Sequence, residues 1–192
     1  MAERRFAGSE LILGGQKSGK SRRAELLARD WLAQDPAHDA LLVATALPWD
    51  EEMRARITRH QMDRAERVPC LATLEEPREL ADVLRRQSRV QTLVVVDCLT
   101  LWLTNRMMPA EGEGEAPEAL AQASAALVAA IEQAAGPVVL VGNEIGLGVI
   151  PLGREVRAFV DELGRLNQAV AATCERVTLM AAGLPLTLKD RP

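Results

Sequence analysis

The amino-acid sequence predicts an α/β protein with a mainly parallel β-sheet and helices on both faces of the sheet. Short apolar runs rich in β-branched residues alternate with longer segments whose apolar residues recur at helical spacing. Strands that alternate with helices form right-handed βαβ units, and such units build a parallel sheet that is covered on both sides. Two strand-like segments close together at the end of the chain predict a C-terminal antiparallel hairpin.

Each expected strand is a short apolar run, and the strongest is TLVVVD at 92–97, which ends in an acid. The strands are expected at residues 10–13, 40–46, 69–73, 92–97, 137–141, 177–181 and 183–189. The helices are expected at residues 21–33, 51–66, 77–87, 119–135 and 154–174. The acidic stretch 108–117 is rich in Gly and Pro and is expected to be a flexible surface loop. No change in composition divides the chain, so residues 1–192 are predicted to form a single domain.

Composition limits the classes of protein to which the chain could belong. With 48% hydrophobic and 26% charged residues and a net charge of −4, nothing calls for a nucleic-acid partner or an anionic membrane surface. The three cysteines are far apart and form no CxxC pair, so neither a zinc site nor a disulfide framework is expected. Because no apolar stretch resembles a signal peptide or a membrane span, we expect a cytoplasmic protein.

The segment at 14–21 reads GGQKSGKS and fits the phosphate-binding pattern GxxxxGK[ST]. In such a loop, glycines let backbone N–H groups surround a phosphate, and the following helix directs its positive end at the same anion. Lys20 is expected to contact the β- and γ-phosphates, and Ser21 to bind Mg²⁺. A chance match is the alternative, but an expected strand before the loop and a helix after it argue against chance. The predicted nucleotide-binding residues of the loop are Gly14, Gly15, Gln16, Lys17, Ser18, Gly19, Lys20 and Ser21.

A phosphate loop of this kind needs a second Mg²⁺ ligand, usually an acid at the end of a neighbouring strand. Asp97 closes the strongest strand and is the best candidate. Alternatively, Asp97 could cap the helix that follows it. The sequence lacks the switch and guanine-reading motifs of GTPases.

The expected helix 51–66 carries a basic face around one of the two histidines of the chain. Arg56, His60 and Arg64 are spaced four residues apart, while Met53 and Ile57 are expected to form the buried stripe of the helix. An imidazole nitrogen can attack phosphorus, and guanidinium groups beside it can hold phosphate oxygens. The alternative is a solvated basic surface that happens to contain a histidine.

Asn143 and Glu144 follow an expected strand at the edge of the sheet where ligands bind. They are candidates for contacts with the nucleotide or the metal. Alternatively, they belong to a polar turn whose glycines serve only the backbone geometry.

Five stretches of the chain together resemble one family. They are 13–21 (LGGQKSGKS), 44–60 (ATALPWDEEMRARITRH), 96–105 (VDCLTLWLTN), 141–151 (VGNEIGLGVIP) and 154–168, which ends GRLNQ. In this combination and order, the sequence resembles the bifunctional adenosylcobinamide kinase/adenosylcobinamide-phosphate guanylyltransferases of cobalamin biosynthesis. Two departures are the lysine at position 17, where the family usually has arginine, and the arginine at position 59, where the family can have a histidine.

The resemblance implies a RecA-like P-loop NTPase fold and two reactions in one domain. ATP or GTP would phosphorylate adenosylcobinamide, and GTP would then donate GMP through a guanylylated histidine, for which His60 is the matching position. It further implies Mg²⁺, a corrinoid substrate and a homo-oligomer, with a trimer as one option. Two other functions stay open from the residues alone. They are a P-loop kinase with a single activity and a non-catalytic switch that binds a nucleoside triphosphate.

Overall fold

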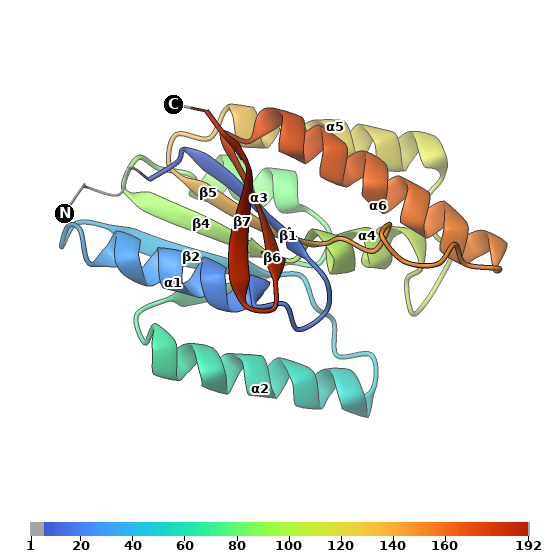
Figure 1. Cartoon of the computed structure of the whole chain (residues 1–192), viewed down its shortest axis with the longest axis horizontal. Helices are drawn as coiled ribbons and strands as arrows, with labels where there is room; N and C mark the ends of the chain where they lie inside the picture. Colours follow the sequence, from blue (N-terminus) through green and yellow to red (C-terminus); the bar gives the residue numbers. More distant parts are fainter. Residues whose placement is uncertain (1–5, 192) are drawn as a thin grey trace.

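The computed structural model describes residues 6–191, which form a seven-stranded sheet flanked by helices (Figure 1). The strand order is β3-β2-β4-β5-β1-β6-β7. All neighbouring strands are parallel except β6 and β7, which form the predicted antiparallel hairpin. The strands are β1 (Ser9–Gly14), β2 (Asp39–Ala44), β3 (Ala72–Glu75), β4 (Thr92–Asp97), β5 (Val138–Asn143), β6 (Arg176–Ala181) and β7 (Leu184–Asp190).

Six helices connect these strands, and the sequence predicted five of them. The helices are α1 (Lys20–Leu32), α2 (Glu51–Arg67), α3 (Leu80–Gln87), α4 (Leu99–Met107), α5 (Pro117–Glu132) and α6 (Arg154–Thr173). Helix α4 is the one that the sequence analysis missed. It begins two residues after β4 ends, and only Asp97 and Cys98 separate its apolar residues from the apolar run of that strand.

Alternate residues of the central strands pack into two separate cores, one on each face of the sheet. Leu11 belongs to the core beneath α3, α4, α5 and α6, whereas its neighbour Ile12 belongs to the core beneath α1. Both side chains are fully buried, which is why the strand reads as a continuous apolar run. The predicted coverage of both faces is therefore confirmed.

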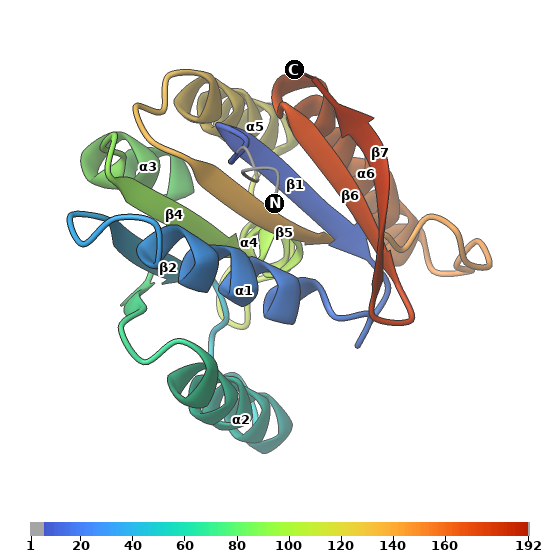
Figure 2. The same cartoon turned by 60° about the vertical axis from the view of Figure 1, so that its left-hand side comes forward.

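Helix α2 corrects one expectation. Met53 and Ile57 were expected to form a buried stripe, but both are only half-buried, and no residue of α2 is buried at all. Figure 2 shows α2 standing away from the sheet, on the far side of α1. Because α2 packs beyond the first helical layer, it lacks the apolar face that a helix lying directly on a sheet requires.

The register of the three central strands places the ends of β1, β4 and β5 at one edge of the sheet. Strand β5 lies between the other two, with Asn143 beside Gly14 and Val141 beside Asp97. The phosphate loop follows β1 at this edge. Within residues 6–191, no helix is both long and apolar enough to cross a membrane.

Candidate active site

The loop between β1 and α1 has the backbone geometry that its glycines allow. Gly14 and Gly19 have φ angles of +153° and +99°, in the region that residues with a Cβ rarely adopt. Gly19 is the N-cap of α1 and supplies no side chain to that helix end. The N–H groups of the first turn of α1 therefore stay available to a bound anion.

Lys20 is buried, with 8% of its surface exposed, and its Nζ donates a hydrogen bond to the carbonyl oxygen of Gly15 at 2.6 Å. Burial lowers the pKa of Lys20, nearby Cys98 and Asp97 oppose that effect, and Arg56 adds to it. The charges at the end of β4 and on the basic face of α2 therefore both affect the pKa of Lys20. The hydroxyl of Ser18 is also buried and has no hydrogen-bond partner among the described residues, so it could contact a bound phosphate.

One cleft of about 560 Å³ joins the loop to helix α2. Its walls come from residues 16–22, from the strand ends at Asp97 and Asn143, and from one face of α2. The residues of α2 that line the cleft are Glu52, Ala55, Arg56, Arg59, His60, Asp63 and Arg67. The structure thus brings His60, Lys20, Ser21 and Asp97 to the same cleft, although His60 lies 40 residues from Lys20 in the sequence.

Four predicted residues do not line this cleft: Arg64, Glu144, Gly14 and Gly15. Arg64 lines a separate hollow on the other side of α2, together with Gln61. Eight residues from Arg56, a helix has turned about 80° past two full turns, so the spacing predicted one face only approximately. Glu144 accepts a hydrogen bond from the N–H of Gly146 at 2.8 Å and does not line the cleft. This hydrogen bond agrees with the polar turn of the alternative interpretation, and the contact of Glu144 with nucleotide or metal stays a prediction.

Asn143 does line the cleft, and two buried side chains hold its backbone. Its N–H donates to Thr100 Oγ1 at 2.9 Å, and its carbonyl oxygen accepts from Asn167 Nδ2 at 3.0 Å.

Of the two glycines that open the loop, Gly14 lies buried at the end of β1 and Gly15 is exposed, and neither lines the cleft.

Thr45, which the sequence analysis did not single out, holds the end of β4. Its N–H donates to the carbonyl oxygen of Asp97, and its hydroxyl both donates to and accepts from the backbone of Cys98, at 2.7 and 2.8 Å. Asn105 on α4 in turn donates to the carbonyl oxygens of Thr45 and Pro77. These partners are 28 to 60 residues apart in the chain, and no spacing rule connects them.

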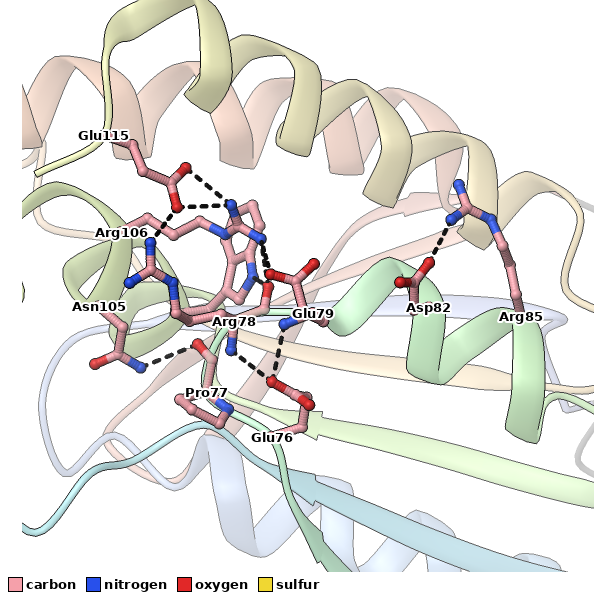
Figure 3. A network of polar contacts seen from close by, with 10 residues as sticks. Glu76, Pro77, Arg78, Glu79, Asp82, Arg85, Asn105, Arg106 and Glu115 are labelled. Carbon is pink, nitrogen blue, oxygen red and sulfur yellow. Dashed lines mark hydrogen bonds and ion pairs between the residues drawn. The ribbon is translucent and has the colours of Figure 1, made fainter.

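Figure 3 shows how this network of polar contacts continues beyond Asn105. Arg106 donates to the carbonyl oxygen of Arg78, as does the indole N–H of Trp102. Arg106 and Arg78 both pair with the carboxylate of Glu115, and Arg106 also pairs with Glu79. Glu115 lies in the loop that was expected to be flexible, so these ion pairs fasten one end of that loop to the body of the protein.

Cys98 is the other group in the cleft that could act as a nucleophile. Burial raises the pKa of its thiol to about 11, and Asp97 adds to the effect. A thiol with that pKa stays protonated near neutral pH and is a poor nucleophile. His60, in contrast to Cys98, is exposed on α2.

The fold and the loop together define a P-loop nucleotide-binding protein. Solved structures with low sequence identity share the fold. The flagellar accessory protein FlaH of Methanocaldococcus jannaschii gives a TM-score of 0.52 at 12% identity, covering 97% of this chain and 80% of that one. A Pyrococcus horikoshii protein gives 0.56 at 8% identity, with 97% and 88% covered.

Comparison by sequence defines the family. Residues 10–188 match the model of the cobinamide kinase / cobinamide phosphate guanyltransferase family. The bifunctional adenosylcobalamin biosynthesis protein CobP of Pseudomonas aeruginosa is 45% identical over 95% of this chain and 98% of its own. The protein of the same description named CobU in Escherichia coli is 34% identical, with 93% and 98% covered. The chain belongs to the cobinamide kinase / cobinamide phosphate guanyltransferase family, which confirms the resemblance seen in the sequence.

Proposed function

We propose that this cleft carries out two reactions in succession, the phosphorylation of adenosylcobinamide and the guanylylation of the resulting phosphate through His60. The observation that carries the proposal is the single cleft that holds both the loop 14–21 and the histidine of α2. One bound triphosphate could then contact Lys20 through its phosphates while its α-phosphorus is presented to His60.

In the kinase step, a hydroxyl of adenosylcobinamide attacks the γ-phosphorus of ATP or GTP. A new P–O bond forms, the bond to the β-phosphate breaks, and the nucleoside diphosphate leaves. Lys20 and the N–H groups at the start of α1 stabilise the charge on the transferred group and on the departing phosphate. Asn143, at the end of the strand between the loop and Asp97, is placed to orient one of the reacting oxygens.

Mg²⁺ fits the donors present at this edge of the sheet. Ser21 offers a hydroxyl and Asp97 a carboxylate, and both line the cleft. Mg²⁺ prefers such oxygen ligands and usually takes its remaining ligands from phosphates and water. When bound, the ion would neutralise charge on the phosphate oxygens.

In the transferase step, an imidazole nitrogen of His60 attacks the α-phosphorus of GTP. The N–P bond forms, the bond between the α- and β-phosphates breaks, and pyrophosphate leaves. An oxygen of adenosylcobinamide phosphate then attacks the same phosphorus and the N–P bond breaks, giving adenosylcobinamide-GDP and free histidine. Arg56 and Arg59 flank His60 in the cleft and are the candidates for holding the phosphate oxygens during both transfers.

The test is incubation of the protein with GTP labelled at the α-phosphate, followed by detection of label on the denatured chain. We expect label that is stable in base and labile in acid, and its absence from His60→Ala. The matched control is His38→Ala. His38 is the other histidine of the chain and stacks on Trp31. Lys20→Met should lose labelling and kinase turnover together. A wild-type protein that binds GTP without becoming labelled would contradict the histidine intermediate.

We also infer that the chain forms a homo-oligomer through β7. This strand is an edge of the sheet, and Leu184, Leu186 and Leu188 project from it with more than half of their surfaces exposed. An exposed edge strand with a row of apolar side chains is a ready surface for pairing with a second copy.

A further inference from the structure

Helix α2, which carries His60, has few attachments to the rest of the molecule. None of its residues is buried, and in Figures 1 and 2 it lies outside α1. Beyond its C-terminal end, Val68 and Leu71 are buried in the core next to α1. Apolar packing therefore fixes where the helix ends, but it does not fix which side of the helix faces the phosphate loop.

One ion pair can fix which side of α2 faces the phosphate loop. Arg67, the last residue of α2, places Nη1 2.5 Å from Oε2 of Glu25 on α1. Among the contacts recorded for residues 6–191, this is the polar side-chain contact that joins α2 to another helix or strand. Arg67 also contacts Asp63 one turn earlier at 3.2 Å, so its guanidinium is held from two sides.

The position of Arg67 relative to His60 links the ion pair to the orientation of His60. Seven residues separate them, which is within about 20° of two full helical turns. The side of α2 that turns toward Glu25 is therefore the side that presents His60 to the cleft, and both residues line that cleft. Rotation of α2 that broke the ion pair would also turn His60 away from the loop.

We propose that Glu25 is a positioning residue for guanylylation: through Arg67 it holds α2 at the rotation that directs His60 toward the phosphate loop. This role rests on the proposed function of His60. Glu25 does not line the cleft and is 1% exposed, so it acts through Arg67.

The burial of Glu25 argues that the carboxylate is not there for general stability. Burial raises the pKa of Glu25, and the hydrogen bond and charge of Arg67 only partly offset this effect. Buried ion pairs are often no more stabilising than apolar residues of similar volume. Arg67 is 31% exposed and keeps its ion pair with Asp63, so Glu25→Leu leaves no fully buried charge unpaired. Removing the carboxylate should therefore release α2 and leave the fold intact.

The experiment compares Glu25→Leu with wild type in two assays, the rate of GMP labelling of His60 and the rate of kinase turnover with ATP. We expect labelling to fall roughly 10- to 100-fold because the nucleophile is misplaced. Kinase turnover should stay within about twofold, since the loop is unchanged. Glu25→Gln keeps an oxygen that can accept from Arg67 and should give an intermediate rate.

The matched control is Arg23→Met, which removes another buried ion pair of α1, the one with Glu10, without touching α2. It should label at the wild-type rate. Equal losses of labelling and kinase turnover in Glu25→Leu would overturn the proposal, because they would place the effect at the phosphate loop. Unchanged labelling would overturn it as well.

Hydrogen exchange tests whether the Glu25–Arg67 ion pair holds α2 in place, without relying on the histidine intermediate. Backbone amides of residues 51–67 should exchange faster in Glu25→Leu than in wild type or Arg23→Met, because a released helix opens more often. Unchanged exchange in α2 would show that the ion pair does not hold the helix. If wild-type protein failed to become labelled, the proposed function of His60 would be contradicted. The hydrogen-exchange comparison would still test whether the Glu25–Arg67 ion pair holds α2 in place.

Discussion

At the end of β1, Gly14 occupies a position with no room for a larger residue. A Cβ added there would lie 2.5 Å from the carbonyl oxygen of Met180 and 2.6 Å from Ser18 Oγ. The first of these atoms belongs to the backbone of β6, the neighbouring strand, and cannot move without disturbing the sheet. Gly15, one residue later, has no atom within 4 Å of the same added carbon.

We therefore expect Gly14→Ala to be strongly destabilising and Gly15→Ala to be tolerated by the fold. Steric clash and backbone strain at Gly14 should cost roughly 2–4 kcal/mol, whereas Gly15→Ala should change stability by less than about 1 kcal/mol. Chemical denaturation of the two variants beside wild type measures the difference. Similar stabilities for both variants would contradict the packing described for β1 and β6.

Single residues with a motif around them could be predicted, and single residues without one could not. The pattern at 14–21 identified Lys20 and Ser21, and both line the cleft. Thr45 and Glu25 carry no such pattern, because their roles depend on partners 53 and 42 residues away. Only the folded chain shows that a threonine after β2 holds the end of β4.

Among the elements, the segment between α4 and α5 is fastened by one carboxylate. Although burial disfavours the charged form of Glu115, hydrogen bonds from Arg78 and Arg106 lower its pKa overall. A carboxylate whose pKa is lower in the folded state stabilises the fold above its unfolded pKa, close to 4.5. That contribution is lost as the pH falls through the lower pKa of the folded protein.

Glu115→Gln should therefore destabilise the protein at pH 7, by roughly 1–3 kcal/mol, and much less in acid. The free energies of unfolding of wild type and variant should converge as the pH drops from 4.5 through the lower pKa of folded Glu115, because Glu115 becomes neutral first in the unfolded protein and then in the folded one. Denaturation curves at several pH values check this. Glu113→Gln, in the same loop, is the control, and the prediction fails if both variants lose stability equally.

The sequence located most elements within a few residues, and its two failures have physical causes. The sequence pattern of an element is clear where the element belongs to the sheet or packs directly on it, as β4 and α1 do. Helix α4 was missed because it begins two residues after β4 and its apolar residues follow closely on the apolar run of that strand. The burial of α2 was wrongly predicted because Met53 and Ile57 occur at helical spacing without reaching a core.

At the scale of the whole molecule, the alternation of strands and helices was enough to predict a mainly parallel sheet. The strand order was not predictable, because it depends on which strands pair across long connections. Placing β5 between β1 and β4 is what brings Asn143 between the loop and Asp97. The cleft that joins α2 to the loop is likewise a property of the assembled chain.

The proposed oligomer can be tested on the outer face of β7. Leu186→Glu, at a side chain that is 57% exposed, should reduce the molar mass measured by light scattering, since a charge buried at an apolar interface is costly. Val90→Glu is the control, because Val90 is 72% exposed and precedes β4, which is an interior strand of the sheet and not an edge strand. A wild-type protein that is monomeric at micromolar concentration would contradict the inference.

The shared cleft also has a consequence for timing. In the proposed mechanism both reactions use one phosphate loop, which holds one triphosphate tail at a time, so the two reactions cannot proceed at the same moment. In that mechanism, ATP bound for the kinase step would exclude the GTP that would guanylylate His60, so each reaction would inhibit the other by occupying the cleft. The ratio of ATP to GTP around the protein, more than the amount of either one, would then set how far adenosylcobinamide phosphate accumulates before it is consumed.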